Sequence, residues 1–163
     1  LNSKTYEDSF LGKYGQRIGA GNTRLDDMTA FWPVYDTDIH RHTRWSAETR
    51  EEADGRFEES VVRWEEFEDD ADCDYSTRGY MAYGLTEPEE LFTNHLLPEG
   101  KILIVKDSFG ASVSSFLSLT AHEVWGVDLR HTDRTLEEVV QELQPDAVVY
   151  IYSQQMLRDF GVQ

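Results

Sequence analysis

The chain has 163 residues and a formal charge of -17, from 32 acidic and 15 basic residues. This length suits one domain with a substantial core. The charge argues against nucleic acids and anionic membrane surfaces as partners, because both require a basic protein face. No apolar run approaches the roughly 20 residues of a membrane-spanning helix, so we expect no direct membrane insertion. A single cysteine, Cys73, excludes an internal disulfide.

The first 97 residues are aromatic-rich, charged and weakly periodic, which predicts an irregular, β-rich portion of the fold. Glycines between positions 12 and 21 predict turns that separate short extended pieces. Residues 28–35 are expected to be extended, whereas residues 47–53 are compatible with a helix. Residues 87–97 predict a short helical turn that begins at Pro88.

Residues 36–45 are rich in side chains that can bind metals. His40 and His42 would share one face if this segment were a strand, which would suit a metal ion. No further ligand set accompanies them, so we favour an exposed polar loop and expect neither a metal nor a cofactor. The acidic run at 65–74 lacks the turn glycine of a calcium loop, and we interpret it as a solvated loop.

Residues 98–163 alternate strand and helix patterns and form the core of the predicted fold. Apolar runs at 102–106, 123–127 and 147–152 predict three buried strands. Helical patterns at 110–119 and 135–143 separate them, the second with Thr135 as N-cap and Glu138 at the capping-box position. This order predicts a parallel sheet with right-handed crossovers.

The sequence Asp107-Ser108-Phe109-Gly110 follows the first of these strands and opens a helix. A serine there has backbone N–H groups and the positive end of a helix dipole beside it. Acyl transfer needs a nucleophile next to such donors. A helix cap formed by Asp107 or Ser108 is the alternative. Ser108, Asp128 and Ser153 all follow predicted strands, and ligands bind at the carboxyl ends of parallel strands, which favours a functional site there.

Several motifs occur together along the chain: FLGKYG from Phe10, KILIVKDSFG from Lys101, SFLS from Ser115, VDLR from Val127 and PDAVVYIYS from Pro145. In combination they resemble the DHHW proteins, which are bacterial cell-envelope members of the SGNH hydrolase-like superfamily and similar to the alginate O-acetyltransferases. The resemblance implies an α/β fold, specifically a three-layer α/β/α, flavodoxin-like (SGNH hydrolase-like) arrangement with a parallel central sheet. It also implies Ser108 as the nucleophile and an extracytoplasmic location.

In the acetyltransferase relatives the base is a histidine from an Asp-x-His element. In the DHHW proteins the corresponding Asp-His-His-Trp motif lies upstream of the Phe-Leu-Gly segment. This sequence contains no such motif and begins with Leu1 rather than Met. We therefore expect residues 1–163 to be a single SGNH-like domain, truncated at its N-terminus, with an irregular portion at 1–97 and a βαβαβ core at 98–163.

Two elements within the chain have spacings that could substitute for the base. Asp38-Ile39-His40 has the Asp-x-His spacing, and Asp128-Leu-Arg-His131 has the Asp-x-x-His spacing of ordinary SGNH hydrolases. Either would need its imidazole within about 3 Å of the Ser108 hydroxyl. Alternatively, His131 lies on the surface and Asp128 contacts Arg130.

Two further side chains are candidates for supporting roles beside Ser108. Asn94 precedes the nucleophile strand and could supply an oxyanion-hole amide, with a turn or cap role as the alternative. Asp107 could support the turn that carries Ser108.

The resemblance implies an SGNH-like esterase or O-acyltransferase acting on acylated cell-envelope or extracellular carbohydrate, inactive in residues 1–163 without a base. A non-catalytic glycan- or protein-binding module on the same scaffold is the alternative, which the aromatic first half and the absent base favour. A receiver-like domain is a third interpretation, but the order of Asp107 and Asp128 and the long first half fit it poorly.

Overall fold

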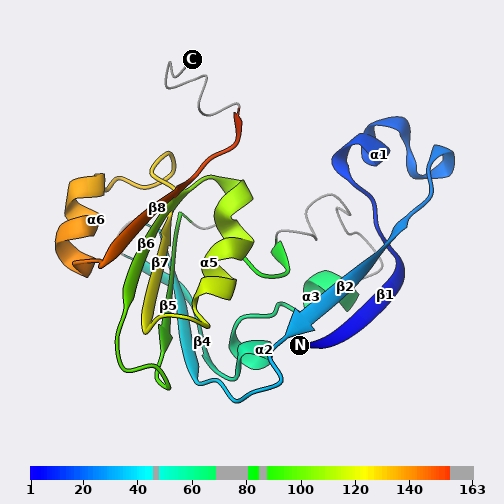
Figure 1. The fold of residues 1–163 in the computed structure, drawn as a ribbon. Coiled ribbons are helices and arrows are strands. Elements are labelled where there is room, and N and C mark those ends of the chain that lie inside the picture. The colour runs from blue at the N-terminus through cyan, green and yellow to red at the C-terminus, as the bar shows by residue number, and fades with distance from the viewer. Residues whose placement is uncertain (46–47, 69–80, 85–87, 155–163) are drawn as a thin grey trace.

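The fold consists of a six-stranded sheet and a two-stranded arm (Figure 1), seen in a computed structural model that describes residues 1–45, 48–68, 81–84 and 88–154. The arm pairs β1 (Asn2–Phe10) with β2 (Asp26–Trp32). The sheet has the order β4-β3-β5-β7-β6-β8. Its strands are β3 (Ile39–Trp45), β4 (Glu48–Gly55), β5 (Glu89–Asn94), β6 (Lys101–Lys106), β7 (Glu123–Val127) and β8 (Ala147–Ile151).

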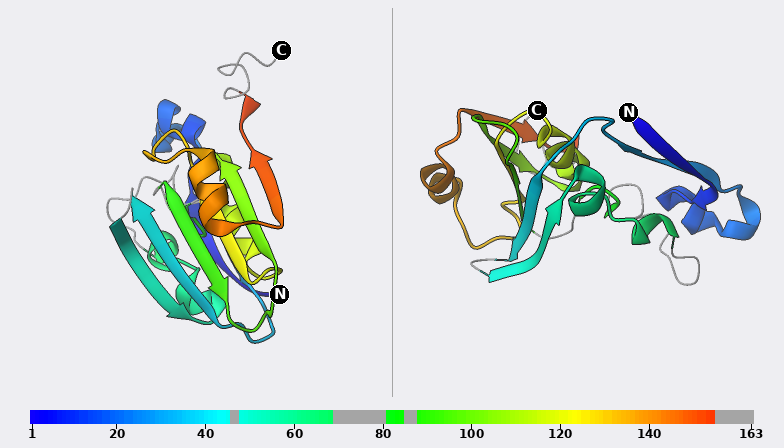
Figure 2. Two further views of the ribbon diagram at one scale, coloured as in Figure 1. Left: turned by 90° about the vertical axis from the view of Figure 1, so that its left-hand side faces the viewer. Right: turned by 90° about the horizontal axis from the view of Figure 1, so that it is seen from below.

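Short helices accompany these strands, and none of those in the described ranges is long and apolar enough to cross a bilayer. They are α1 (Lys13–Ile18), α2 (Phe57–Ser60), α3 (Glu65–Glu68), α5 (Ala111–Leu117) and α6 (Leu136–Leu143), with the 3-10 turns η1 (Ala20–Asn22) and η2 (Ser108–Gly110). Helices α5 and α6 lie on opposite faces of the sheet, as Figures 1 and 2 show.

The parallel part of the sheet is centred on β6, which lies between β7 and β8. Its side chains alternate between the two faces, as the geometry of a strand requires. Leu103 and Val105 pack with Val139 and Leu143 of α6, whereas Ile104 joins the cluster beneath α5. This burial on both faces explains why the β6 sequence is almost continuously apolar.

The strands and helices predicted for the second half of the chain are confirmed, with small differences at their ends. The capping box of α6 forms as expected: the Thr135 hydroxyl accepts from the Glu138 N–H at 3.3 Å, and the Glu138 carboxylate accepts from the Thr135 N–H at 2.7 Å. The α/β class is thus confirmed, and the sheet is mixed rather than wholly parallel, because β5 and β4 run antiparallel to their neighbours. A complete three-layer flavodoxin-like arrangement stays a prediction, as does the division at residue 97.

Three predictions for the first half were wrong. Residues 36–45 are largely strand β3 rather than a loop, residues 47–53 fall mostly in β4 rather than a helix, and residues 87–97 contain β5 rather than a helical turn. On β3 every second side chain is buried, as expected for a strand. Two of these buried side chains are the polar Arg41 and Thr43, so the sequence does not show the alternation of apolar residues that would predict a strand. Charged β4 becomes a strand because it pairs with β3, which overrides local propensity. Most of the acidic run at 65–74, predicted to be a solvated loop, lies outside the described residues.

The arm is joined to the rest of the fold by aromatic side chains, and Figure 1 shows α1 at its far end. Tyr6 stacks on Phe67 with ring centroids 5.2 Å apart, and Trp32 meets Trp64 edge-on at 5.3 Å. The hydroxyl of Tyr83 accepts from the Phe31 N–H and donates to the Phe31 carbonyl, and the Tyr83 carbonyl accepts from Ser115 of α5. Tyr83 therefore connects β2 directly to α5, and it is buried.

A buried acidic side chain lies on the α6 face where β5 begins. Glu89 is completely buried, accepts from the Thr132 hydroxyl at 3.0 Å and pairs with Arg134 at 3.3 Å. Burial raises the pKa of Glu89, while the hydrogen bond from Thr132 and the charge of Arg134 oppose that rise. The carboxylate thus depends on Arg134 for compensation of its charge.

Arg134 also belongs to a wider network that closes this face. Arg44 and Arg134 both pair with Glu142 of α6, and their guanidinium groups lie 5.4 and 5.0 Å from the ring centre of Trp125. Guanidinium groups over an indole face are favourable contacts. The network therefore joins β3, β5, β7 and α6.

Replacing Arg134 with alanine should destabilise the fold by about 3–5 kcal/mol at neutral pH, because Glu89 would then be a buried, uncompensated charge. A carboxyl group with a raised folded-state pKa imposes its cost above that pKa, and protonation removes the cost as the pH falls through it. Denaturant unfolding at pH 7 and at about pH 5 should therefore show that Arg134→Ala loses less unfolding free energy at the lower pH. Arg50→Ala, which removes an exposed pair with Glu48, is the control. Equal losses at both pH values would contradict the assignment.

Candidate functional site

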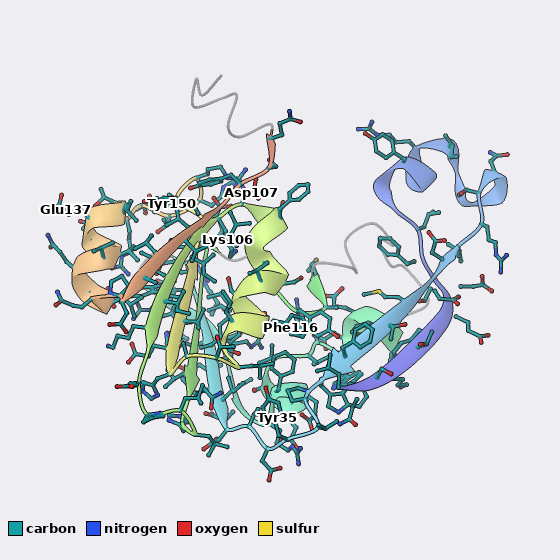
Figure 3. The ribbon with its side chains drawn as sticks, viewed as in Figure 1. Tyr35, Lys106, Asp107, Phe116, Glu137 and Tyr150 are labelled. Atoms are coloured by element: carbon teal, nitrogen blue, oxygen red, sulfur yellow. The ribbon has the colours of Figure 1, made fainter. Side chains whose placement is uncertain are left out.

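The carboxyl ends of β6, β7 and β8 meet at one edge of the sheet, and Asp107 and Ser108 directly follow β6. Asp107 is buried, and its two carboxylate oxygens accept hydrogen bonds from the N–H of Phe109 at 2.9 Å and of Ser153 at 2.7 Å. The Asp107 N–H donates to the Ile151 carbonyl at 3.2 Å. Figure 3 shows Asp107 at the end of β6 beside β8. Asp107 therefore fixes both the η2 turn and the end of β8.

The electrostatics of Asp107 favour its charged form. Burial by itself would raise the pKa of this carboxyl, but the hydrogen bonds from Ser153 and Phe109 and the positive charge of Arg130 outweigh that effect and lower it. Asp107 is consequently an ionised residue that accepts hydrogen bonds at neutral pH. Its orientation toward two backbone N–H groups identifies it as the cap of η2.

Ser108 is the first residue of η2, and it is exposed. Because Asp107 caps the turn, the Ser108 hydroxyl is not needed for capping, which removes the main structural alternative for this serine. Within the described ranges no hydrogen bond joins its hydroxyl to a histidine. Phe109, the next residue in the sequence, is 75% exposed. The arrangement presents a serine on a rigid turn at the functional edge of the sheet.

Asp128 and His131 follow β7 at the same edge, but they do not form a catalytic pair. The two carboxylate oxygens of Asp128 accept from Nε and a terminal nitrogen of Arg130, at 2.8 and 2.5 Å. Burial would raise the pKa of Asp128, but the bonds and charge of Arg130 lower it. His131 is exposed, and its backbone N–H donates to the Asp128 carbonyl at 3.1 Å. The alternative interpretation, an Asp128–Arg130 contact at the strand end, is the arrangement found.

Asp38 and His40 lie at the opposite edge of the sheet from Ser108. They lie at the start of β3, which runs in the same direction as β6, so both are at the amino ends of these strands. His40 Nδ1 lies 2.7 Å from a carboxylate oxygen of Asp54, not of Asp38. This histidine is therefore not brought to Ser108.

His40 and His42 do share one face of a strand, with ring centroids 5.5 Å apart. Burial and the positive charge of Arg44 lower the pKa of His42. Among residues 1–45, 48–68, 81–84 and 88–154, however, no three His, Cys, Asp or Glu side chains are grouped to hold a metal ion.

Asn94 also lies away from Ser108. Its amide nitrogen donates to the Ser118 carbonyl at 2.9 Å, and its oxygen accepts from the Leu96 N–H at 3.1 Å. Ser118 follows the last turn of α5, whereas Ser108 precedes the first. Asn94 thus joins β5 to the far end of α5, which agrees with a turn role and places its amide at the wrong end of the helix for an oxyanion hole.

Lys106, the last residue of β6, is a buried charged residue that sequence reasoning did not single out. The aliphatic part of the Lys106 side chain fills the space next to two glycines. A Cβ atom at Gly110 would lie 2.6 Å from the Lys106 Cβ, and a Cβ atom at Gly126 would lie 3.0 Å from the Lys106 Cε. The side chain therefore runs under the first turn of α5 toward β7, away from the edge that bears Ser108. The alternation of β6, which places residue 106 on the face of Ile104, was the signal available in the sequence.

A surface cavity of about 600 Å³ opens at the amino ends of the parallel strands, lined in part by Lys101, His122 and Asp146. It lies at the opposite edge of the sheet from Ser108 and includes none of the residues discussed for catalysis. The candidate site is therefore an open edge and not this cavity.

Solved structures provide the comparison that bears on this edge. A DHHW family protein from Eubacterium siraeum matches with a TM-score of 0.66 and 18% identity, over 93% of this chain and 47% of that one. The resemblance to a DHHW protein is confirmed at the level of the fold. A structure of Bacillus cereus PatB1 with a sulfonyl adduct matches with a TM-score of 0.66 and 16% identity, over 96% and 48%.

A second PatB1 structure matches with a TM-score of 0.64 and 16% identity, over 96% of this chain and 50% of that chain. This chain thus spans about half the length of the solved proteins that it matches. No protein-family model matches the sequence, and no curated protein sequence matches it significantly. The relation to SGNH hydrolases stays a prediction.

Replacing Asp107 with asparagine should lower the free energy of unfolding by about 1–3 kcal/mol at pH 7, because the amide NH₂ would face a buried N–H donor. A lowered folded-state pKa contributes stability above the unfolded-state value of about 3.9, and this is lost as the pH falls through the folded-state pKa. The difference in free energy of unfolding between the unsubstituted protein and Asp107→Asn, measured with urea, should therefore narrow as the pH falls below about 3.9. Asp146→Asn, at an exposed aspartate that binds the Lys101 N–H, is the control. A constant difference would contradict a charged Asp107.

Proposed function

We propose that the protein is an SGNH-like esterase or O-acyltransferase that acts on acylated cell-envelope or extracellular carbohydrate, with Ser108 as the nucleophile. The observation that carries the proposal is the exposed Ser108 on a turn fixed by Asp107 at the carboxyl edge of a parallel β7-β6-β8 unit. The fold shared with a DHHW protein supports it. So does the fold shared with PatB1, which has been solved with a sulfonyl adduct.

In the proposed reaction the Ser108 hydroxyl attacks the carbonyl carbon of an acyl ester. A C–O bond forms, the carbonyl electron pair moves to oxygen, and a base takes the hydroxyl proton. Collapse of the intermediate expels the sugar oxygen, which receives that proton. Water or another sugar hydroxyl then releases the acyl group from Ser108 by the reverse sequence. The backbone N–H of Ser108 is the proposed donor to the oxyanion.

The proposal requires a base from outside residues 1–163. The described part of the chain brings no histidine into hydrogen-bond contact with Ser108, and a serine hydroxyl is a weak nucleophile without one. The solved neighbours are about twice as long as this chain, which is consistent with a base on a further segment. Residues 1–163 alone should therefore have little activity. An extracytoplasmic location is part of the proposal, because the substrate polymers lie there.

The full natural protein should be labelled by a fluorophosphonate probe, and Ser108→Ala should abolish that labelling. Residues 1–163 alone should react about a thousandfold or more slowly, because loss of the base removes most nucleophile activation. Labelling followed by gel fluorescence measures both rates, with Ser112→Ala of α5 as the matched serine control. Labelling that persists in Ser108→Ala, or full natural protein that neither labels nor releases acyl groups, would refute the proposal.

A non-catalytic glycan- or protein-binding module is the second candidate. The lack of a histidine at Ser108 in the described ranges favours it, and Phe109 offers an exposed aromatic surface at the same edge. Binding on a glycan array that is unchanged by Ser108→Ala, with no probe labelling of the full natural protein, would support this function over catalysis.

A further inference from the structure

The cavity at the amino ends of the parallel strands lies between three segments of the chain. The loop that leads into β6 forms one wall, the residue before β7 forms a second, and the segment between α6 and β8 forms a third. Its volume of about 600 Å³ falls within the range of small-ligand pockets and suits a monosaccharide. The proposed reaction at the opposite edge of the sheet does not use this cavity.

Backbone groups fix the walls of the cavity against one another. The Asp146 N–H donates to the Lys101 carbonyl at 2.9 Å, and the Lys101 N–H donates to an Asp146 carboxylate oxygen at 2.9 Å. At the second wall, the His122 N–H donates to the Glu99 carbonyl at 3.1 Å. Walls held in this way are preorganised, so a ligand does not have to order them when it binds.

The imidazole of His122, which lines the cavity, has one nitrogen committed to the protein and one left for a ligand. Its Nδ1 lies 3.0 Å from the Asn94 carbonyl oxygen, and because a carbonyl can only accept, Nδ1 carries the proton. In the neutral ring Nε2 is then an acceptor. This nitrogen lies 3.9 Å from a Glu123 carboxylate oxygen, which is beyond hydrogen-bond distance. His122 therefore offers Nε2 to a ligand as an acceptor.

Two carboxylates make the lining acidic as well as rich in acceptors. Glu99 and Asp146 both line the cavity and both are exposed. One Asp146 oxygen accepts from the Lys101 N–H, and within the described ranges no hydrogen bond engages the other oxygen or the Glu99 carboxylate. The Lys101 ammonium in the lining is already paired with Glu123, at 3.0 Å. The lining thus disfavours anions, and the formal charge of -17 on the whole chain acts in the same direction.

We propose that this cavity binds a small hydroxylated ligand that carries a protonated amine, such as an amino sugar. The ammonium group contacts the carboxylates of Asp146 and Glu99, because charge-assisted hydrogen bonds are the stronger kind. The ligand hydroxyls donate to His122 Nε2 and accept from Lys101 Nζ, which has three N–H groups. A metal ion is a poorer occupant, because the described part of the chain groups no three His, Cys, Asp or Glu side chains to hold one. The proposal is independent of the reaction proposed at the carboxyl edge.

Glucosamine and glucose test the role of the amine, because they differ only in an amino or a hydroxyl group at one carbon. The full natural protein with labelled histidines is titrated with each sugar while its imidazole signals are followed by NMR, and His122→Gln identifies the His122 signal. Glucosamine should shift this signal saturably, with a dissociation constant about tenfold or more below that of glucose, the ratio that one charge-assisted hydrogen bond supports. Equal affinities for the two sugars, or no shift with glucosamine, would overturn the proposal. This comparison uses the unsubstituted protein, so it does not depend on the folding of a variant.

Substitution of both carboxylates tests which groups bind the amine. In Glu99→Gln/Asp146→Asn the amide oxygen at residue 146 can still accept from the Lys101 N–H, so the charges are removed and the wall is kept. Glucosamine should bind about tenfold or more weakly to this variant, and the affinity for glucose should be unchanged. Glu7→Gln, at an exposed glutamate of β1, is the control and should alter neither affinity. Equal glucosamine affinities in the two variants would overturn the proposal.

The same titration separates this cavity from the proposed catalytic edge. Ser108→Ala should bind glucosamine with the affinity of the unsubstituted protein, because the cavity lies at the opposite edge of the sheet. Loss of probe labelling in Ser108→Ala without loss of glucosamine binding would show that the two sites are separate. A glucosamine affinity that falls in Ser108→Ala would overturn the assignment of the amine to the cavity.

Discussion

The candidate site depends on the buried carboxylate of Asp107. Its two oxygens accept hydrogen bonds from backbone N–H groups in two separate places, Phe109 of the η2 turn and Ser153, which follows β8. Backbone donors cannot rotate away as side chains can, and an ionised acceptor strengthens both bonds. Ser108 lies between Asp107 and Phe109, so the turn that bears its hydroxyl is held at both ends. The same carboxylate that completes the fold therefore positions the proposed nucleophile.

The charged groups around this edge are already committed to structural partners. Asp128 pairs with Arg130, and Glu89 pairs with Arg134, so neither carboxylate is turned toward a histidine. Lys106 is directed beneath α5, where close packing against Gly110 and Gly126 fixes its stem. The described residues thus form a scaffold that fixes the serine but offers no acid–base partner for it. Catalysis by this edge requires a group from elsewhere.

The sequence predicted the second half of the fold well because its strands are apolar on both faces and its helix α6 carries a capping box. Prediction failed on β3, β4 and β5: β3 and β5 pair across about 45 residues of sequence, and β4 forms by pairing with β3. Arg41 and Thr43 are buried on β3, and most side chains of β4 are charged, so neither strand shows the apolar alternation. For the site, Ser108 and Asp107 were identifiable from their place after a strand. Asp-x-His spacing could not reveal that His40 lies at the opposite edge.

The exposure of the β8 edge and the lack of a histidine contact to Ser108 among the described residues are two separate observations. The exposure of Val149 and Tyr150 concerns packing alone, and the absence of a histidine contact to Ser108 within the described ranges concerns chemistry alone. In an α/β sheet the carboxyl ends of the parallel strands form the site, so the end of β8, which Asp107 holds beside Ser108, belongs to the same edge. Catalysis at Ser108 therefore needs an acid–base group beyond those that the described residues place beside it.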